Sequence, residues 1–157
     1  MSRNYWMINV TPENFAITRD LGFTVLGLQS IWRKKAQRME PGDRLLFYIR
    51  EKQTFGATAN VTSTYCEEHT PVWKSHIPTE DFPYRVQTEP VVVLEEEEFL
   101  DARQIGPRLD YVKKWVPEMW PLAFLGELHL IPRKDFTLIE EEMKKAVSAR
   151  AKAYASL

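Results

Sequence analysis

The chain has 157 residues and a net charge of −1, with 44% hydrophobic and 27% charged residues, which is typical of one globular domain spanning residues 1–157. No stretch approaches the ~20 apolar residues of a membrane helix, and the N-terminus lacks the apolar run of a signal peptide, so no membrane partner is expected. The single cysteine, Cys66, excludes an internal disulfide and favours a reducing, cytoplasmic location.

The first predicted elements are a strand, a helix and a second strand. Residues 5–10 form the first strand. Thr11-Pro12 then begins a helix, because threonine caps helices and proline suits the first helical position. We expect this helix to end near Gly22, followed by a short apolar strand over residues 24–28.

A hairpin is predicted at the centre of the fold. Residues 30–38 are basic and contain a helical turn, and the turn Pro41-Gly42-Asp43 then leads into a strand over residues 44–49. A second strand covers residues 55–61. Apolar residues alternate in both strands, which predicts one face in a core, and Gly56 permits close packing against the backbone.

A long polar connection over residues 62–81 follows the hairpin. Connections of this length without regular structure are uncommon in compact domains and are often functional. Residues 82–88 and 91–94 are then predicted as two strands separated by Pro90. The second is a continuous apolar run, which predicts burial on both faces.

The last third of the chain is predicted to contain two short helical pieces, over residues 99–106 and 107–115, and a final strand over residues 128–131. Pro132 opens the longest helix. We therefore predict an α+β fold with a mixed sheet curled toward a barrel and helices outside it. The apolar stripe of the last helix consists of Phe136, Ile139, Met143, Ala146, Val147 and Tyr154.

Signals for catalysis are weak. There is no glycine-rich phosphate loop and no nucleophile elbow. Cys66, His69 and His76 lie close in sequence, but a closed zinc site needs four ligands and a nucleophilic cysteine needs an oriented base. We expect no metal, no cofactor and no enzyme activity, with a small-molecule enzyme built on this loop as an alternative.

Aromatic and basic residues are more informative. Of the five tryptophans, Trp6 and Trp115 resemble core residues. Trp73 lies on the long polar loop, where burial is harder to arrange, and a nucleobase that stacks on a ring needs an exposed face. The densest basic cluster, a candidate for phosphate binding, consists of Arg33, Lys34, Lys35 and Arg38.

The chain resembles the EVE domain family, which belongs to the PUA-like superfamily together with the YTH domains. The similarity covers nearly the whole chain and ends in the closing helix. It rests on the order and spacing of Tyr5-Trp6, Pro41-Gly42-Asp43, Leu46-Phe47-Tyr48, Gly56, Val61, Pro83-Tyr84-Arg85-Val86, Phe124 and Gly126.

The resemblance implies a PUA-like pseudo-barrel that binds nucleic acid without catalysis and holds a flipped, modified base. In YTH domains an aromatic cage receives N6-methyladenine, and one cage tryptophan lies where this chain has Trp73. A second cage tryptophan falls where this chain has Leu26, before Gly27, which favours a different pocket, such as one for a modified cytosine. By the same resemblance, Asn9 or Asn14 hydrogen-bonds a base edge, and Trp120 and Phe124 close the pocket.

Three hypotheses follow for the function. The first is a reader of modified bases in DNA or RNA, with Trp73 stacking on the base. The second is a general RNA-binding accessory domain that uses the basic cluster on the nucleic-acid backbone. The third is the small-molecule enzyme that uses the Cys66, His69 and His76 loop.

Overall fold

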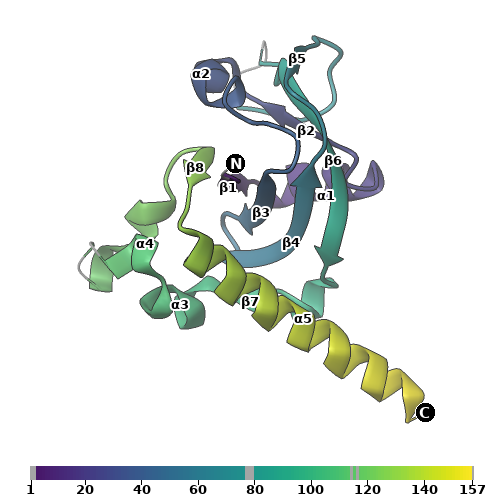
Figure 1. Cartoon of the computed structure of the whole chain (residues 1–157), viewed down its shortest axis with the longest axis vertical. Helices are drawn as coiled ribbons and strands as arrows, with labels where there is room; N and C mark the ends of the chain where they lie inside the picture. The colour runs from purple at the N-terminus through teal and green to yellow at the C-terminus, as the bar shows by residue number, and fades with distance from the viewer. Residues whose placement is uncertain (1–2, 77–79, 114, 116, 157) are drawn as a thin grey trace.

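The protein is described by a computed structural model that covers residues 3–76, 80–113, 115 and 117–156. Its strands form one curled, mixed sheet in the order β2-β6-β4-β3-β1-β8, with β5 added to β6 and β7 to β4 (Figure 1). β1 and β3 are parallel, and the other pairs are antiparallel. The strands are β1 (Tyr5–Val10), β2 (Val25–Leu28), β3 (Arg44–Ile49), β4 (Thr54–Val61), β5 (Cys66–Glu67), β6 (Tyr84–Val93), β7 (Leu100–Asp101) and β8 (Leu128–Leu130).

Helices flank the sheet, and the longest of them, α5, runs across it (Figure 1). The predicted α+β fold with a curled sheet and a C-terminal helix is therefore confirmed. The α-helices are α1 (Pro12–Asp20), α2 (Arg33–Ala36), α3 (Ala102–Ile105), α4 (Asp110–Lys113) and α5 (Arg133–Ala155). The 3-10 helices are η1 (Ser30–Trp32), η2 (Glu96–Glu98), η3 (Gly106–Arg108) and η4 (Pro117–Phe124).

The central hairpin of β3 and β4 is buried on both faces, so the prediction of one buried face was wrong. Leu45, Phe47 and Ile49 point into a core shared with α1 and β2. Leu46 and Tyr48 point into a second core shared with α3, α4, η4 and α5. A sheet covered on both sides needs apolar residues at consecutive positions, as in β3.

Several local predictions were also wrong. Pro90 does not separate two strands, because β6 continues through it and accommodates it with a register shift opposite Ala59. Val91 is 43% exposed, so this part of β6 is not buried on both faces. Trp115 is 37% exposed and is not a core residue, and the stripe of α5 stops before Tyr154, which is 70% exposed.

The start of α1 follows the sequence signals. The Thr11 side chain accepts a hydrogen bond from the backbone N–H of Asn14, and Pro12 occupies the first turn. Gly22 adopts a φ of 73° after the helix, as expected for a terminating glycine. In the part of the chain that the structure covers, no helix is both long and apolar enough to cross a membrane.

Candidate functional site

The site lies where the parallel strands β1 and β3 end at the same edge of the sheet. The Arg50 backbone N–H, just beyond β3, donates to the Val10 carbonyl at 2.9 Å. Its guanidinium Nη2 donates to the Asn9 carbonyl at 3.0 Å. This pairing brings two polar side chains from separate strands to one place.

A small recess lies beneath these strand ends, with a volume of about 20 Å³. This is room for one water-sized group. Five of the predicted nucleobase-binding residues line it together, although they come from four segments of the chain. They are Asn9, Asn14, Leu26, Gly27 and Trp73.

A larger outer cavity of about 340 Å³ adjoins the recess, because Asn14, Arg50 and Phe82 line both. Its wall includes Gln29 and Lys74. The outer cavity is large enough for a flat heterocycle, whereas the recess accepts only a small group.

Trp73 is a wall of the recess and is only 6% exposed, so the expectation of an exposed ring was wrong. Its indole N–H donates to the Thr18 hydroxyl at 2.9 Å. The ring lies so close to Gly27 that a Cβ there would be 2.3 Å from it. A partner for the N–H and a glycine beneath the ring allow a loop tryptophan to be buried.

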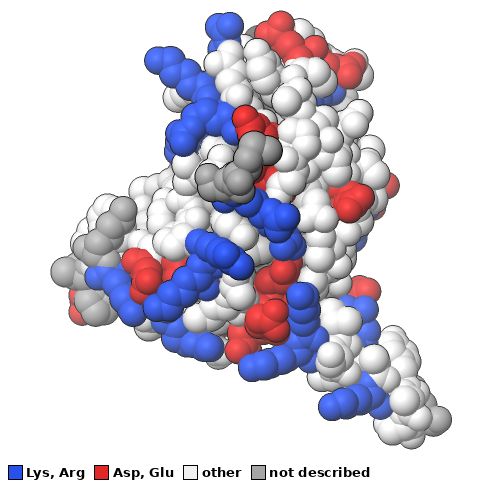
Figure 2. Space-filling model, in the orientation of Figure 1, with Lys and Arg blue, Asp and Glu red and all other residues white. Residues whose placement is uncertain are grey.

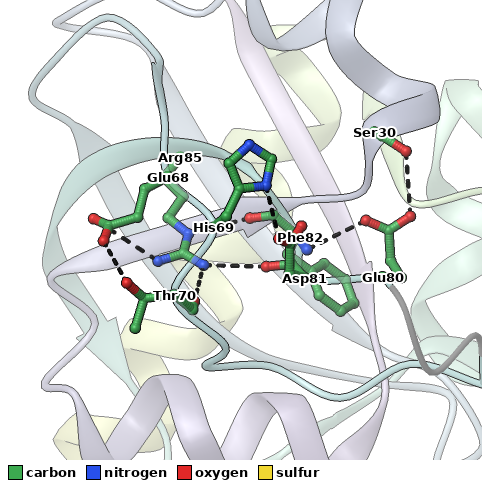
Figure 3. A network of polar contacts seen from close by, with 8 residues as sticks. All are labelled: Ser30, Glu68, His69, Thr70, Glu80, Asp81, Phe82 and Arg85. Carbon is green, nitrogen blue, oxygen red and sulfur yellow. Dashed lines mark hydrogen bonds and ion pairs between the residues drawn. The ribbon is translucent and has the colours of Figure 1, made fainter.

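Arg85 holds the loop that carries Trp73. Figure 3 shows the Arg85 guanidinium among Thr70, Asp81 and Phe82 of the same connection. Its guanidinium donates to the carbonyls of Phe82 and Asp81, both at 3.1 Å, and to the Thr70 carbonyl. The guanidinium also lies 5.2 Å from the centroid of a Trp73 ring. Arg85 faces Gly27 across the β2–β6 pair, so one residue fixes both the loop and the ring.

The two candidate asparagines have different environments. The Asn14 amide exchanges two hydrogen bonds with the Lys74 backbone, both at 2.8 Å, so it anchors the loop. Asn9 donates from Nδ2 to the Phe124 carbonyl at 2.6 Å, while its Oδ1 is buried and has no hydrogen-bond partner among the described residues. Asn9 therefore offers a free acceptor at the recess.

Glu127 also lines the recess, and no pattern in the sequence pointed to it. It is 5% exposed, and one carboxyl oxygen accepts from the Gln29 backbone N–H at 2.9 Å. Burial raises the pKa of Glu127 to about 8, opposed by the Gln29 hydrogen bond and the charge of Arg50. The Arg50 Nε is a second buried atom without a partner among the described residues.

Trp120 and Phe124 do not line the recess, so their predicted place at the pocket was wrong. The Phe124 ring stacks on Tyr48 at 4.7 Å between centroids, and Trp120 meets Phe124 edge to face at 5.6 Å. Both rings lie on the other face of the sheet, with the second core. Only the Phe124 carbonyl reaches the site, through Asn9.

The basic cluster lies on and just after α2, which follows Gln29 of the outer cavity through η1. Arg33, Lys34 and Arg38 are exposed. Lys35 instead donates to the Leu128 carbonyl at 2.8 Å, and burial followed by the charge of Arg38 lowers its pKa. Figure 2 shows Lys and Arg side chains gathered over α2 and acidic ones over β5.

The cysteine and histidines of the long loop are spread out. Cys66 is exposed in β5, His69 contacts the Asp81 carboxylate at 2.7 Å, and His76 lines the outer cavity. No group of three or more candidate metal ligands occurs among the residues described.

Solved structures with a similar fold include YTH domains. The YTH domain-containing protein mmi1 in an RNA complex has a TM-score of 0.69 at 10% identity, covering 96% of this chain and 87% of that chain. The Pho92 YTH domain in complex with m6A has a TM-score of 0.62 at 12% identity, covering 90% and 84%. At these identities the likeness is one of fold.

Curated relatives are similar over nearly their full length. The UPF0310 protein PYRAB08750 of Pyrococcus abyssi is 25% identical over 146 residues, covering 87% of this chain and 97% of the relative. The UPF0310 protein PH1033 of Pyrococcus horikoshii is 26% identical over 148 residues, with the same coverage. The family model of the EVE domain matches residues 4–119. Since this match spans well over half of the chain, the protein belongs to the EVE domain family.

Proposed function

We propose that the protein is a non-catalytic nucleic-acid-binding domain that takes one base of a single strand into the outer cavity. The base directs a small substituent, such as a methyl group, into the recess walled by Trp73, Leu26 and Gly27. The observation that carries the proposal is the pairing of a cavity of about 340 Å³ with an adjoining recess of about 20 Å³. YTH domains of the same fold, with RNA or m6A bound, support it.

The polar groups of the site suit a base better than an apolar ligand. Asn9 Oδ1 is a buried acceptor without a partner among the described residues, and a base edge provides the donor it lacks. Asn14 acts through the loop, because its amide is bound to the Lys74 backbone. Arg33, Lys34 and Arg38 contact the phosphates that flank the bound base.

Removing a base from a duplex costs a few kcal/mol, so single strands bind better than duplexes. Burying one methyl carbon contributes ~0.8 kcal/mol, which is about a fourfold preference for the modified strand. A stacking or packing contact between a base and an aromatic ring contributes ~1–3 kcal/mol to binding. Removing the ring should therefore weaken the binding free energy by a similar amount.

The test is the binding of short single strands, with and without a methylated central base, to the wild-type protein and to Trp73→Ala. We expect tighter binding of the methylated strand and a loss of that preference in Trp73→Ala. The matched control is Trp115→Ala, because Trp115 is 37% exposed and does not line either cavity. Equal affinity for all strands, unaffected by Trp73→Ala, would contradict the proposal and favour general RNA binding through α2.

A further inference from the structure

Two buried polar side chains and the partly buried Arg50 converge on the recess from separate strand ends. Asn9 comes from the end of β1, Arg50 from beyond β3, and Glu127 from the residue before β8. Two of them carry an atom that has no hydrogen-bond partner in the part of the chain described, namely Asn9 Oδ1 and Arg50 Nε. Unpaired buried polar atoms are costly, so their convergence at a cavity indicates a ligand edge that pairs them.

The hydrogen bonds that these three side chains already make determine whether each can still donate or accept. Asn9 Nδ2 already donates to the Phe124 carbonyl, so the Asn9 atom that lacks a partner among the described residues is the acceptor Oδ1. Arg50 Nε can only donate. One Glu127 oxygen accepts from the Gln29 backbone N–H, which leaves the other oxygen to donate if the carboxyl is protonated.

We propose that Glu127 is a specificity-determining residue of this site and that, as a neutral carboxylic acid, it donates to the bound base. The side chains that line the recess then present one acceptor, Asn9 Oδ1, and two donors, Arg50 Nε and Glu127, to the edge of a base held in the outer cavity. This set matches an edge with one donor and two acceptors, which is the Watson–Crick edge of a pyrimidine. The inference rests on the proposed function and adds the class of base.

Purines fit this set less well. Guanine presents two donors and one acceptor on its Watson–Crick edge, so at best one donor of the protein would face a donor of the base. Adenine presents one donor and one acceptor, so one donor of the protein stays unpaired. If Glu127 were ionised, it would become a second acceptor, and the three groups of the protein would match guanine. The protonation state of Glu127 therefore decides which class of base the site binds.

The surroundings of Glu127 favour the neutral form. Burial is the dominant influence on its pKa, the charge of Glu80 acts in the same direction, and the Gln29 hydrogen bond and Arg50 act in the opposite one. Lys35 donates to the carbonyl of the next residue, Leu128. His129, two residues along, has its pKa lowered mainly by burial, so it stays neutral above pH 7.

The test compares single strands that differ only in the central base, bound to the wild-type protein between about pH 6.5 and pH 9. We expect pyrimidine-centred strands to bind best, with an affinity that falls above about pH 8, approaching about tenfold per pH unit as Glu127 ionises. Glu127→Gln keeps a donor that does not titrate, so this variant should bind pyrimidines with no such fall. Glu127→Ala should lose the preference for pyrimidines.

Three results would overturn the proposal: a preference for guanine, an affinity that rises with pH, or the same pH profile in Glu127→Gln as in the wild type. Melting temperatures of both variants show whether each is folded. If strands bind and Trp73→Ala weakens their binding, while the Glu127 variants bind as the wild type does, only this inference fails. If the binding of no strand depends on Trp73, the proposed function itself fails.

Discussion

Gly27 and Trp73 meet in a contact that leaves no room for a side chain on the glycine. A Cβ at Gly27 would be 2.3 Å from one ring carbon of Trp73 and 2.5 Å from another. Trp73 has little freedom to yield, because Thr18 holds its N–H and Arg85 lies against its ring. The glycine therefore sets the position of the recess wall.

Gly27→Ala should destabilise the protein by about 1–3 kcal/mol, the usual cost of overpacking, and should abolish any preference for a methylated base. Urea unfolding and strand binding measure the two effects. The control is Gly106→Ala, since a Cβ there is 3.8 Å from its nearest neighbour, Trp120. If Gly27→Ala keeps both wild-type stability and the preference, Trp73 does not form a fixed wall.

At the scale of single residues, the sequence predicted part of the candidate site. Asn9, Asn14, Leu26, Gly27 and Trp73 were chosen by resemblance, and the fold brings them to one recess, while their role in binding stays a prediction. No pattern in the sequence indicated that Asn14 would bind the loop, or that Asn9 would keep an acceptor without a partner among the described residues. That difference depends on which carbonyl lies within reach, which only the folded chain decides.

At the scale of elements, the loop after β4 depends on one arginine in β6. Arg85, a residue that is 5% exposed, donates to three loop carbonyls. Hydrogen bonds from charged donors contribute about 1.5–3 kcal/mol each, and a lysine cannot reproduce the planar fork.

Arg85→Lys should therefore lower the free energy of unfolding by roughly 2–4 kcal/mol and make residues 68–76 more susceptible to proteolysis. Limited proteolysis and urea unfolding check this. Arg103→Lys is the matched control, because Arg103 is exposed and bonds only Asp101 in the described structure. Equal cleavage of both variants would show that Arg85 does not hold the loop.

The elements themselves were largely predictable. The alternating residues of β1, β3 and β4 and the capping signals of α1 follow local rules. Pro90 was misjudged because a proline interrupts a strand only where no bulge absorbs it, and the bulge depends on the partner strand β4. Glu127 was missed because its burial results from β8 pairing with β1, far away in sequence.

At the scale of the whole molecule, charge is divided along the chain. Residues 1–60 carry nine Lys/Arg against five Asp/Glu, and residues 61–157 carry twelve against seventeen.

Replacing Arg33 and Lys34 with glutamine should weaken binding to all strands alike and reduce its salt dependence, because fewer counterions are released. Salt titrations of strand binding measure this, and an unchanged slope would exclude α2 from the interface.

Glu127 also links the stability of the molecule to pH. Its pKa rises from 4.5 in the unfolded chain to about 8 in the folded protein, so between these values the folded state holds a proton that the unfolded state has released. The free energy of unfolding therefore falls as pH rises through this window. Since one pKa unit is about 1.36 kcal/mol, Glu127→Gln should be more stable than the wild type at pH 8 by about 2 kcal/mol or more.

The matched comparison is the same pair of proteins near pH 4.5, where Glu127 is protonated in the folded state and half protonated in the unfolded state, so this linkage advantage should be small. Urea unfolding across the pH range measures the difference. A constant difference between wild type and Glu127→Gln over this range would show that Glu127 ionises normally in the folded state.

Entry of a base beside Trp73 can be followed through the indole N–H resonances of the isotope-labelled tryptophans during titration with a methylated single strand. The Trp73 N–H, bound to Thr18, should shift and saturate with the strand, while the Trp115 resonance stays in place. Saturable binding that leaves the Trp73 resonance unmoved would show that the base does not enter beside Trp73.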